Sequence, residues 1–210
     1  NIGNFKKNFY QRLAYDEIFS TFLVNSEIRK KIKKVKKKNK IIDIYKQNKM
    51  MKELDFSLTN DQINSLQQIN KDLSSSKKMF RLLQGDVGSG KTIVSLLAAF
   101  NTINSGFQVA LMAPTEILAR QHFNLAKKLF SSDINIKLIS GKSDYKDKKD
   151  IYNQLKTHKI DIIIGTHAIF QKKIIFNDLG LIIIDEQHKF GVSQRKKLSD
   201  KGGINCDILL

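Results

Sequence analysis

Side chains suited to phosphate groups and divalent metal ions occur in two segments of this sequence. In the first, residues 82–92 read LLQGDVGSGKT, and residues 85–92 satisfy the spacing G-x-x-x-x-G-K-[ST]. Glycines let the backbone wrap around phosphate oxygens, so that successive N–H groups and the start of a helix face the anion. Lys91 then reaches the terminal phosphates, and the Thr92 hydroxyl ligates Mg²⁺. We therefore predict ATP binding by Gly85, Asp86, Val87, Gly88, Ser89, Gly90, Lys91 and Thr92, named here the phosphate loop.

The second segment, residues 181–186, is an apolar run that ends in Asp185 and Glu186. An aspartate at the end of a buried strand can hold Mg²⁺, usually through water, and the next acid can polarise an attacking water. Because phosphoryl transfer needs little beyond positioning and charge neutralisation, Lys91, Asp185 and Glu186 are the candidate catalytic residues. Thr92 and Asp185 are the candidate metal ligands. The structural alternative is an acid pair that caps a following helix, and the phosphate loop in the same chain argues against it.

Apolar strands alternate with helices around these two segments. We expect strands at residues 79–83, 107–112, 134–139, 160–164, 181–184 and 206–210. We expect helices from residue 61 to 73, 92 to 104, about 116 to 129, 145 to 156 and 192 to 198. Nearly continuous apolar strands that alternate with helices indicate an α/β fold with a parallel sheet covered on both faces. In such sheets the site lies at the strand carboxyl ends, and Gly85, Pro114, Gly165 and Asp185 all follow strands.

The composition limits the class of protein. The chain has 210 residues, of which 41% are hydrophobic, enough for one α/β domain with an appendage. Its single cysteine, Cys206, excludes a disulfide framework and favours a reducing compartment, so we expect a cytoplasmic protein. No apolar run approaches the length of a membrane span. Because the sequence stops within an expected strand, we also expect it to be a fragment of a longer protein.

A basic segment precedes the expected sheet. The net charge is +17, and residues 1–55 hold 15 basic against 6 acidic residues, so we predict an appendage at 1–55 and a lobe at 56–210. Tyr15, Ile18, Phe19, Phe22 and Leu23 recur at helical spacing. We expect this basic helix to continue through residues 29–40, frayed towards Asn39, with lysines facing solvent or DNA. The charge favours nucleic acid, while a solvated helix face or biased composition is the alternative.

Four sequence motifs carry a resemblance to a known family. They are GDVGSGKT at 85–92, APTEILA-x-QH at 113–122, IIGTHA at 163–168 and LGLIIIDEQH-x-FGV at 179–192. Together they resemble the first RecA-like lobe of superfamily-two helicases, and within it the RecG-type ATP-dependent DNA helicases. The segment QRLAYDEIF at 11–19 is similar to the helix before the motor in that type. The resemblance implies a P-loop NTPase with a RecA-like parallel sheet, preceded by a basic helical segment.

The resemblance also implies roles for individual residues. Phe56 and Gln62 lie in a segment that resembles the family's adenine-reading motif, in which Gln62 would read the base. Arg120 and Lys189 depart from the family pattern, which has an acid and an arginine there. Residues implied to face DNA are Pro114, Thr115, Glu116, Gly165, Thr166 and His167, and residues implied to couple DNA to ATP are Gln187 and His188.

The activity implied by the resemblance is ATP-dependent remodelling of branched DNA, such as replication forks or Holliday junctions, in recombination and repair. The partners implied are branched duplex DNA, an N-terminal wedge domain and a second RecA-like lobe that carries arginine fingers. Without those parts, we expect the chain to be nearly inactive. One alternative is a transcription-repair coupling translocase, whose acidic motif typically reads DEEH and whose phosphate loop typically has Phe at the position of Ser89. Another alternative is a basic DNA-binding module whose phosphate loop does not hydrolyse ATP.

Overall fold

A parallel sheet forms the centre of the molecule. The computed structural model describes residues 36–141, 145–171, 173–186 and 203–210, together with Arg12, Tyr15 and Phe19. Six strands pair in the order β1-β6-β5-β2-β4-β3, and each of these pairings is parallel. The strands are β1 (Phe80–Arg81), β2 (Gln108–Met112), β3 (Ile136–Ile139), β4 (Ile162–Gly165), β5 (Leu179–Ile184) and β6 (Asp207–Leu209). The predicted parallel α/β fold is confirmed.

Two of the described helices precede the first strand and others connect the strands, and local signals in the sequence fix their ends. They are α2 (Ile44–Lys52), α3 (Asn60–Leu73), α4 (Lys91–Asn104), α5 (Glu116–Leu129), α6 (Tyr145–Lys156) and the 3-10 helix η1 (His167–Phe170). Thr59 caps α3 through a reciprocal pair of bonds with Gln62, and Thr115 caps α5. Gly106 follows α4 with a φ of +81°, the left-handed conformation that commonly ends a helix. In the described part of the chain, no helix is both long and apolar enough to cross a membrane.

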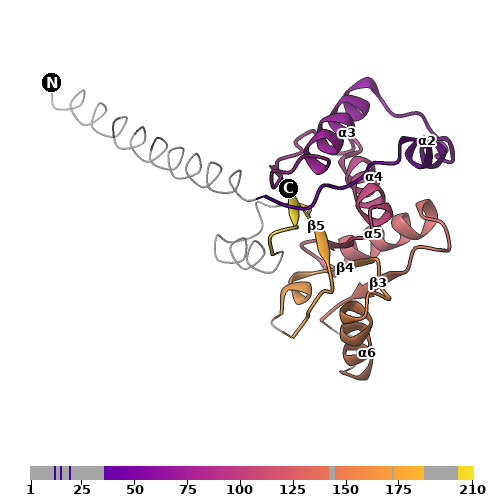
Figure 1. The fold of residues 1–210 in the computed structure, drawn as a ribbon, viewed down its shortest axis with the longest axis vertical. Helices are drawn as coiled ribbons and strands as arrows, with labels where there is room; N and C mark the ends of the chain where they lie inside the picture. The colour runs from indigo at the N-terminus through magenta and orange to yellow at the C-terminus, as the bar shows by residue number, and fades with distance from the viewer. Residues whose placement is uncertain are drawn as a thin grey trace.

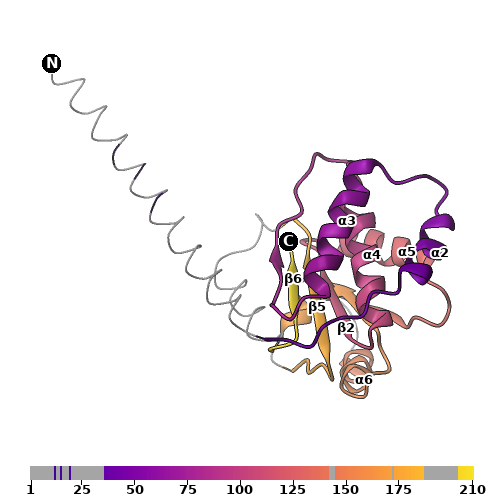
Figure 2. The same ribbon diagram turned by 45° about the horizontal axis from the view of Figure 1, so that its top comes forward.

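Two hydrophobic cores cover the two faces of the sheet, because neighbouring residues of a strand point to opposite sides. Val109 and Leu111 of β2 belong to the core shared with α3, α4 and α5. Ala110 and Met112 belong to the core shared with α6 and η1. Figure 1 shows α6 on the side of the sheet opposite α3 and α4, and Figure 2 shows α3 beside α4. The result is a three-layer arrangement with the carboxyl ends of the strands at one edge.

Most element positions agree with the prediction to within a few residues, and β1 is the main exception. The expected buried strand at residues 79–83 is only two residues long, and Phe80 is 40% exposed. Its position explains this, since β1 is the last strand of the described sheet and pairs with β6 alone. The helix expected at 192–198 lies outside the described residues.

The basic segment differs from the prediction where it is described. Tyr15 and Phe19 are helical, as expected, and their rings stack with centroids 5.8 Å apart. Residues 36–43, in contrast, are not helical, and Lys36 forms an isolated β-bridge with Lys77. The prediction of a helix with solvent-facing lysines through residue 40 is therefore wrong at its C-terminal end, where Lys37 and Lys40 are buried.

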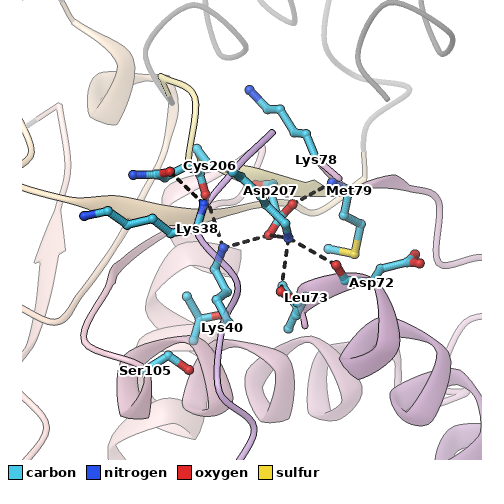
Figure 3. Close-up of polar contacts among 12 residues, drawn as sticks. Lys38, Lys40, Asp72, Leu73, Lys78, Met79, Ser105, Cys206 and Asp207 are labelled. Atoms are coloured by element: carbon cyan, nitrogen blue, oxygen red, sulfur yellow. Dashed lines mark hydrogen bonds and ion pairs between the residues drawn. The ribbon is translucent and has the colours of Figure 1, made fainter. Parts of the chain in front are cut away.

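A buried carboxylate explains the burial of these two lysines (Figure 3). Asp207 of β6 accepts hydrogen bonds from the Nζ atoms of Lys37 and Lys40, at 2.7 Å for Lys40, and from the backbone N–H of Met79 at 2.6 Å. Lys37 also donates to the carbonyl of Leu73 at the end of α3. Burial lowers the pKa of Lys37, and the charge of Asp207 opposes that shift. Lys37, Lys40 and Asp207, named here the Asp207 cluster, fasten the extended segment to the sheet.

Candidate functional site

A cavity of about 420 Å³ lies at the carboxyl edge of the sheet. The phosphate loop follows β1, the start of α4 follows the loop, and the acidic pair follows β5. Because all strands run in parallel, these three segments meet at the same edge. The predicted residues that line the cavity are Gly85, Val87, Lys91, Thr92, Asp185 and Glu186. The structure therefore brings together both halves of the predicted nucleotide site.

The phosphate loop curls around the ammonium group of its own lysine. Lys91 donates to the carbonyl oxygens of Gly85 and Asp86, at 2.6 and 2.7 Å. Gly88 and Gly90 have φ angles of +81° and +79°, which favour glycine. A Cβ atom on Gly90 would also lie 2.3 Å from Nε2 of Gln62, so that the glutamine side chain would have to move away from the loop. The loop conformation therefore depends on its glycines.

Gln62 joins the start of α3 to the phosphate loop. Its Oε1 accepts from the Thr59 backbone N–H at 2.9 Å, and its Nε2 donates to the Ser89 carbonyl at 2.8 Å. The glutamine thus lies beside the loop, as its predicted role requires. Phe56 is 49% exposed and lines a separate cavity of about 770 Å³ with Leu58. Adenine recognition by Gln62 and Phe56 remains a prediction.

Asp185 is fixed by contacts that the sequence did not indicate. Its Oδ2 lies 2.8 Å from Nε2 of His122, a buried residue of α5, and its backbone N–H donates to the Met112 carbonyl at 2.9 Å. Since an ionised carboxylate only accepts hydrogen bonds, Nε2 of His122 carries the proton. This hydrogen bond lowers the pKa of Asp185 against the effect of burial, and Lys91 lowers it further. The Asp185 carboxylate is therefore negatively charged at neutral pH and could ligate a metal ion.

The donor set fits Mg²⁺. The Thr92 hydroxyl and the Asp185 carboxylate line the same cavity, and both offer oxygen atoms. Mg²⁺ is usually held by one or two carboxylates together with substrate phosphates and waters. Glu186, beside Asp185, has a φ of +50°, an uncommon conformation for a residue with a side chain and one that often occurs at functional sites. Gln187 and His188 lie outside the described residues.

The residues predicted to face DNA lie together at the carboxyl ends of β2 and β4. These strands are neighbours in register, Met112 opposite Gly165, and the Ala113 N–H donates to the Gly165 carbonyl at 2.9 Å. A Cβ atom on Gly165 would lie 2.2 Å from the Ile139 carbonyl oxygen, so glycine is needed for this approach. The structure thus groups Pro114, Thr115 and Glu116 with Gly165, Thr166 and His167, and DNA contact by them stays a prediction.

Comparisons with known proteins agree with this geometry. The sequence profile described as DEAD/DEAH box helicase matches residues 59–203. The chain is 42% identical over 202 residues to the ATP-dependent DNA helicase RecG of Aquifex aeolicus, covering 96% of this chain and 26% of that protein. It is 44% identical over 206 residues to RecG of Thermotoga maritima, covering 95% and 26%. A solved structure of RecG bound to a three-way DNA junction matches with a TM-score of 0.80 at 40% identity, covering 95% of this chain and 27% of that one. The chain thus spans about a quarter of the length of these relatives.

Proposed function

The chain belongs to the DEAD/DEAH box helicase family, and we propose that it is the ATP-binding motor lobe of an ATP-dependent DNA helicase that acts on branched DNA. The observation that carries the proposal is the convergence of Lys91, Thr92, Asp185 and Glu186 on one cavity. These are the groups that phosphoryl transfer to water requires: a cation for the phosphates, oxygen ligands for a metal ion and a carboxylate for the water.

Each residue has a distinct part in the proposed reaction. Lys91 exchanges its carbonyl partners in the phosphate loop for the β- and γ-phosphates of ATP. Thr92 and Asp185 hold Mg²⁺, which neutralises developing phosphate charge when bound. Glu186 polarises the attacking water. A cationic residue from a second lobe would contribute a further factor of about 10³–10⁵ in rate in comparable NTPases, so we expect the chain alone to turn over slowly.

Branched DNA is proposed as the substrate on two grounds. Relatives at 42% and 44% identity are RecG helicases, and the solved relative at 40% identity is bound to a three-way junction. The net charge of +17 suits a polyanionic partner. In this proposal, the turn at Pro114–Glu116 and the neighbouring residues Gly165–His167 face the DNA, whereas the phosphate loop faces ATP.

A binding titration tests the ATP site. We expect calorimetry to show at least a tenfold loss of Mg-nucleotide affinity in Lys91→Ala, because charge-assisted phosphate contacts contribute about 1.5–3 kcal/mol each. Lys71→Ala, which removes an exposed lysine of α3, is the matched control and should bind like the wild type. Equal affinity of all three proteins would exclude the proposed site and favour a DNA-binding module with an inactive phosphate loop.

A second measurement tests the substrate. In the intact protein that contains this chain, ATP hydrolysis should be stimulated more by a three-way junction than by linear duplex of the same length. Equal stimulation would refute the preference for branched DNA and leave the ATP site unaffected.

A further inference from the structure

We propose that His122 is a positioning residue that couples the DNA-facing turn at Pro114–Glu116 to the metal-binding carboxylate of Asp185. The proposal rests on the proposed function, because it assumes that Asp185 holds Mg²⁺ and that the turn meets DNA. It goes further by assigning a role to a buried histidine of α5, a helix that belongs to neither the phosphate loop nor the acidic segment.

The first observation is that one short stretch of chain contacts Asp185 at both of its ends. Met112, the last residue of β2, accepts the backbone N–H of Asp185 at 2.9 Å. Ten positions later, Nε2 of His122 lies 2.8 Å from Oδ2 of Asp185. The Pro114–Glu116 turn lies between these two contacts in the sequence. Any movement of the turn and of α5 relative to β5 is therefore transmitted to both the backbone and the side chain of Asp185.

The second observation is that the stretch between the contacts is capped and packed against the sheet. The Thr115 side chain accepts the Leu118 N–H at 3.3 Å and so caps the first turn of α5. Ala119 is buried in the core beside β4, so α5 is held against the sheet. A capped helix that is packed along its length moves as a unit rather than by local bending. Force at the turn thus reaches His122 through α5.

The third observation concerns the orientation of the carboxylate. The terminal torsion of an aspartate is broad, so its oxygens do not point in one direction without a partner. The His122 side chain is 9% exposed and that of Asp185 is 29% exposed, and both line the nucleotide cavity. Hydrogen-bonded partners of metal-binding carboxylates orient the ligand, and their loss typically reduces metal affinity or activity about 10–100-fold. His122 has the position and the proton for this role.

The test measures nucleotide affinity rather than turnover. Binding of a fluorescent ADP derivative to the intact protein is measured with and without Mg²⁺, and with and without three-way junction DNA. In His122→Ala we expect the enhancement by Mg²⁺ to fall at least tenfold, with little change in Mg²⁺-free affinity, and the effect of DNA on ADP affinity to disappear. Coupling of two sites is reciprocal, so ADP should also lose its effect on DNA affinity.

Two conservative variants separate positioning from packing. The amide nitrogen of His122→Gln reaches about as far as imidazole Nε2 and should restore both effects. The side chain of His122→Asn is too short to place its amide nitrogen at that point, so this variant should behave like His122→Ala while it keeps a buried polar group. His122→Asn can therefore replace His122→Ala in the test if the alanine variant does not fold. Asn124→Ala, an exposed position on the same helix, should match the wild type.

Each outcome decides between the proposals. Suppose that Mg²⁺ and junction DNA change the ADP affinity of the wild type, and change that of His122→Ala and His122→Asn by the same factors. The histidine then has only a structural role, and the coupling proposal is wrong. If the wild type binds no Mg-nucleotide, the proposed function and the coupling proposal fail together.

Discussion

Asp207→Asn is expected to destabilise this fold strongly, because it removes the only carboxylate of the Asp207 cluster. The side chains of Lys37, Lys40 and Asp207 are all 0% exposed. An asparagine keeps an oxygen for the Met79 N–H but presents no charge to the two ammonium groups. Burial lowers the pKa of Lys37 even with Asp207 in place. The charge of Asp207 is the main effect that favours the charged lysine, and Asp207→Asn removes it.

The size of the effect follows from the burial. Removal of one partner from a buried ion pair typically costs about 3–5 kcal/mol, because the other charge remains buried and unpaired. Domains have total stabilities of about 5–15 kcal/mol, so this loss is a large fraction of the whole. With a urea m-value of about 2–3 kcal/mol per molar, the unfolding midpoint should fall by about 1–2.5 M, measured by circular dichroism.

Two variants serve as controls for Asp207→Asn. Asp55 and Lys128 form an ion pair at 2.8 Å with side chains 78% and 73% exposed, so Asp55→Asn should leave the midpoint unchanged. The triple change Lys37→Met, Lys40→Met and Asp207→Leu removes all three charges together. Apolar replacement of a whole buried ion network is often nearly neutral, so the triple variant should be more stable than Asp207→Asn.

The comparison between Asp207→Asn and Asp55→Asn tests whether the two lysines are buried. If Asp207→Asn shifts the midpoint no more than Asp55→Asn, the lysines are not held in the interior. The basic segment would then face solvent through residue 40, as its composition alone suggests, and the account of the Asp207 cluster would be refuted.

Two further changes probe the ATP site and the core. Glu186→Gln in the intact protein should keep ATP affinity and lose turnover, since the carboxylate acts on the attacking water; hydrolysis at the wild-type rate would contradict its role. Burial raises the pKa of the Cys206 thiol from 9.0 to about 12, so thiol reagents at pH 8 should label it only after unfolding. The unfolded thiol ionises first, so the stability of the wild type should fall relative to Cys206→Ala as the pH rises above about 9, and parallel pH profiles would refute this.

Features encoded in adjacent residues were predictable from the sequence. The phosphate loop, the acidic pair and the apolar strands depend on spacing within a few residues, and apart from the shortened β1 they appear where they were expected. The cap of α3 is equally local, because Thr59 and its partner Gln62 are three positions apart. The order of strands in the sheet depends on long-range pairing, and no local pattern specifies it.

Contacts between distant polar residues were not predictable. His122 and Asp185 are 63 positions apart, and Lys37 and Asp207 are 170 apart. A lysine in a basic run is ordinarily exposed, and the sequence offered no sign that Asp207 would bury two of them. For His122 the only signal was its place in a segment that resembles a helicase motif, which gave it no role.

The Asp207 cluster and the nucleotide cavity are connected through β6. This strand lies between β1, which leads into the phosphate loop, and β5, which ends at Asp185. Asp207 is its first residue, and Leu210, directly after its end, lines the cavity and accepts the backbone N–H of Leu83 at 2.8 Å. The extended segment at residues 36–40 is thus fastened to the strand that spaces the two halves of the ATP site. Because β6 is hydrogen-bonded to both β1 and β5, a change in its position between them would alter the separation of Lys91 and Asp185. Asp207→Asn should therefore weaken Mg-nucleotide binding even in protein that remains folded, and unchanged affinity in that variant would show that the segment and the site are independent.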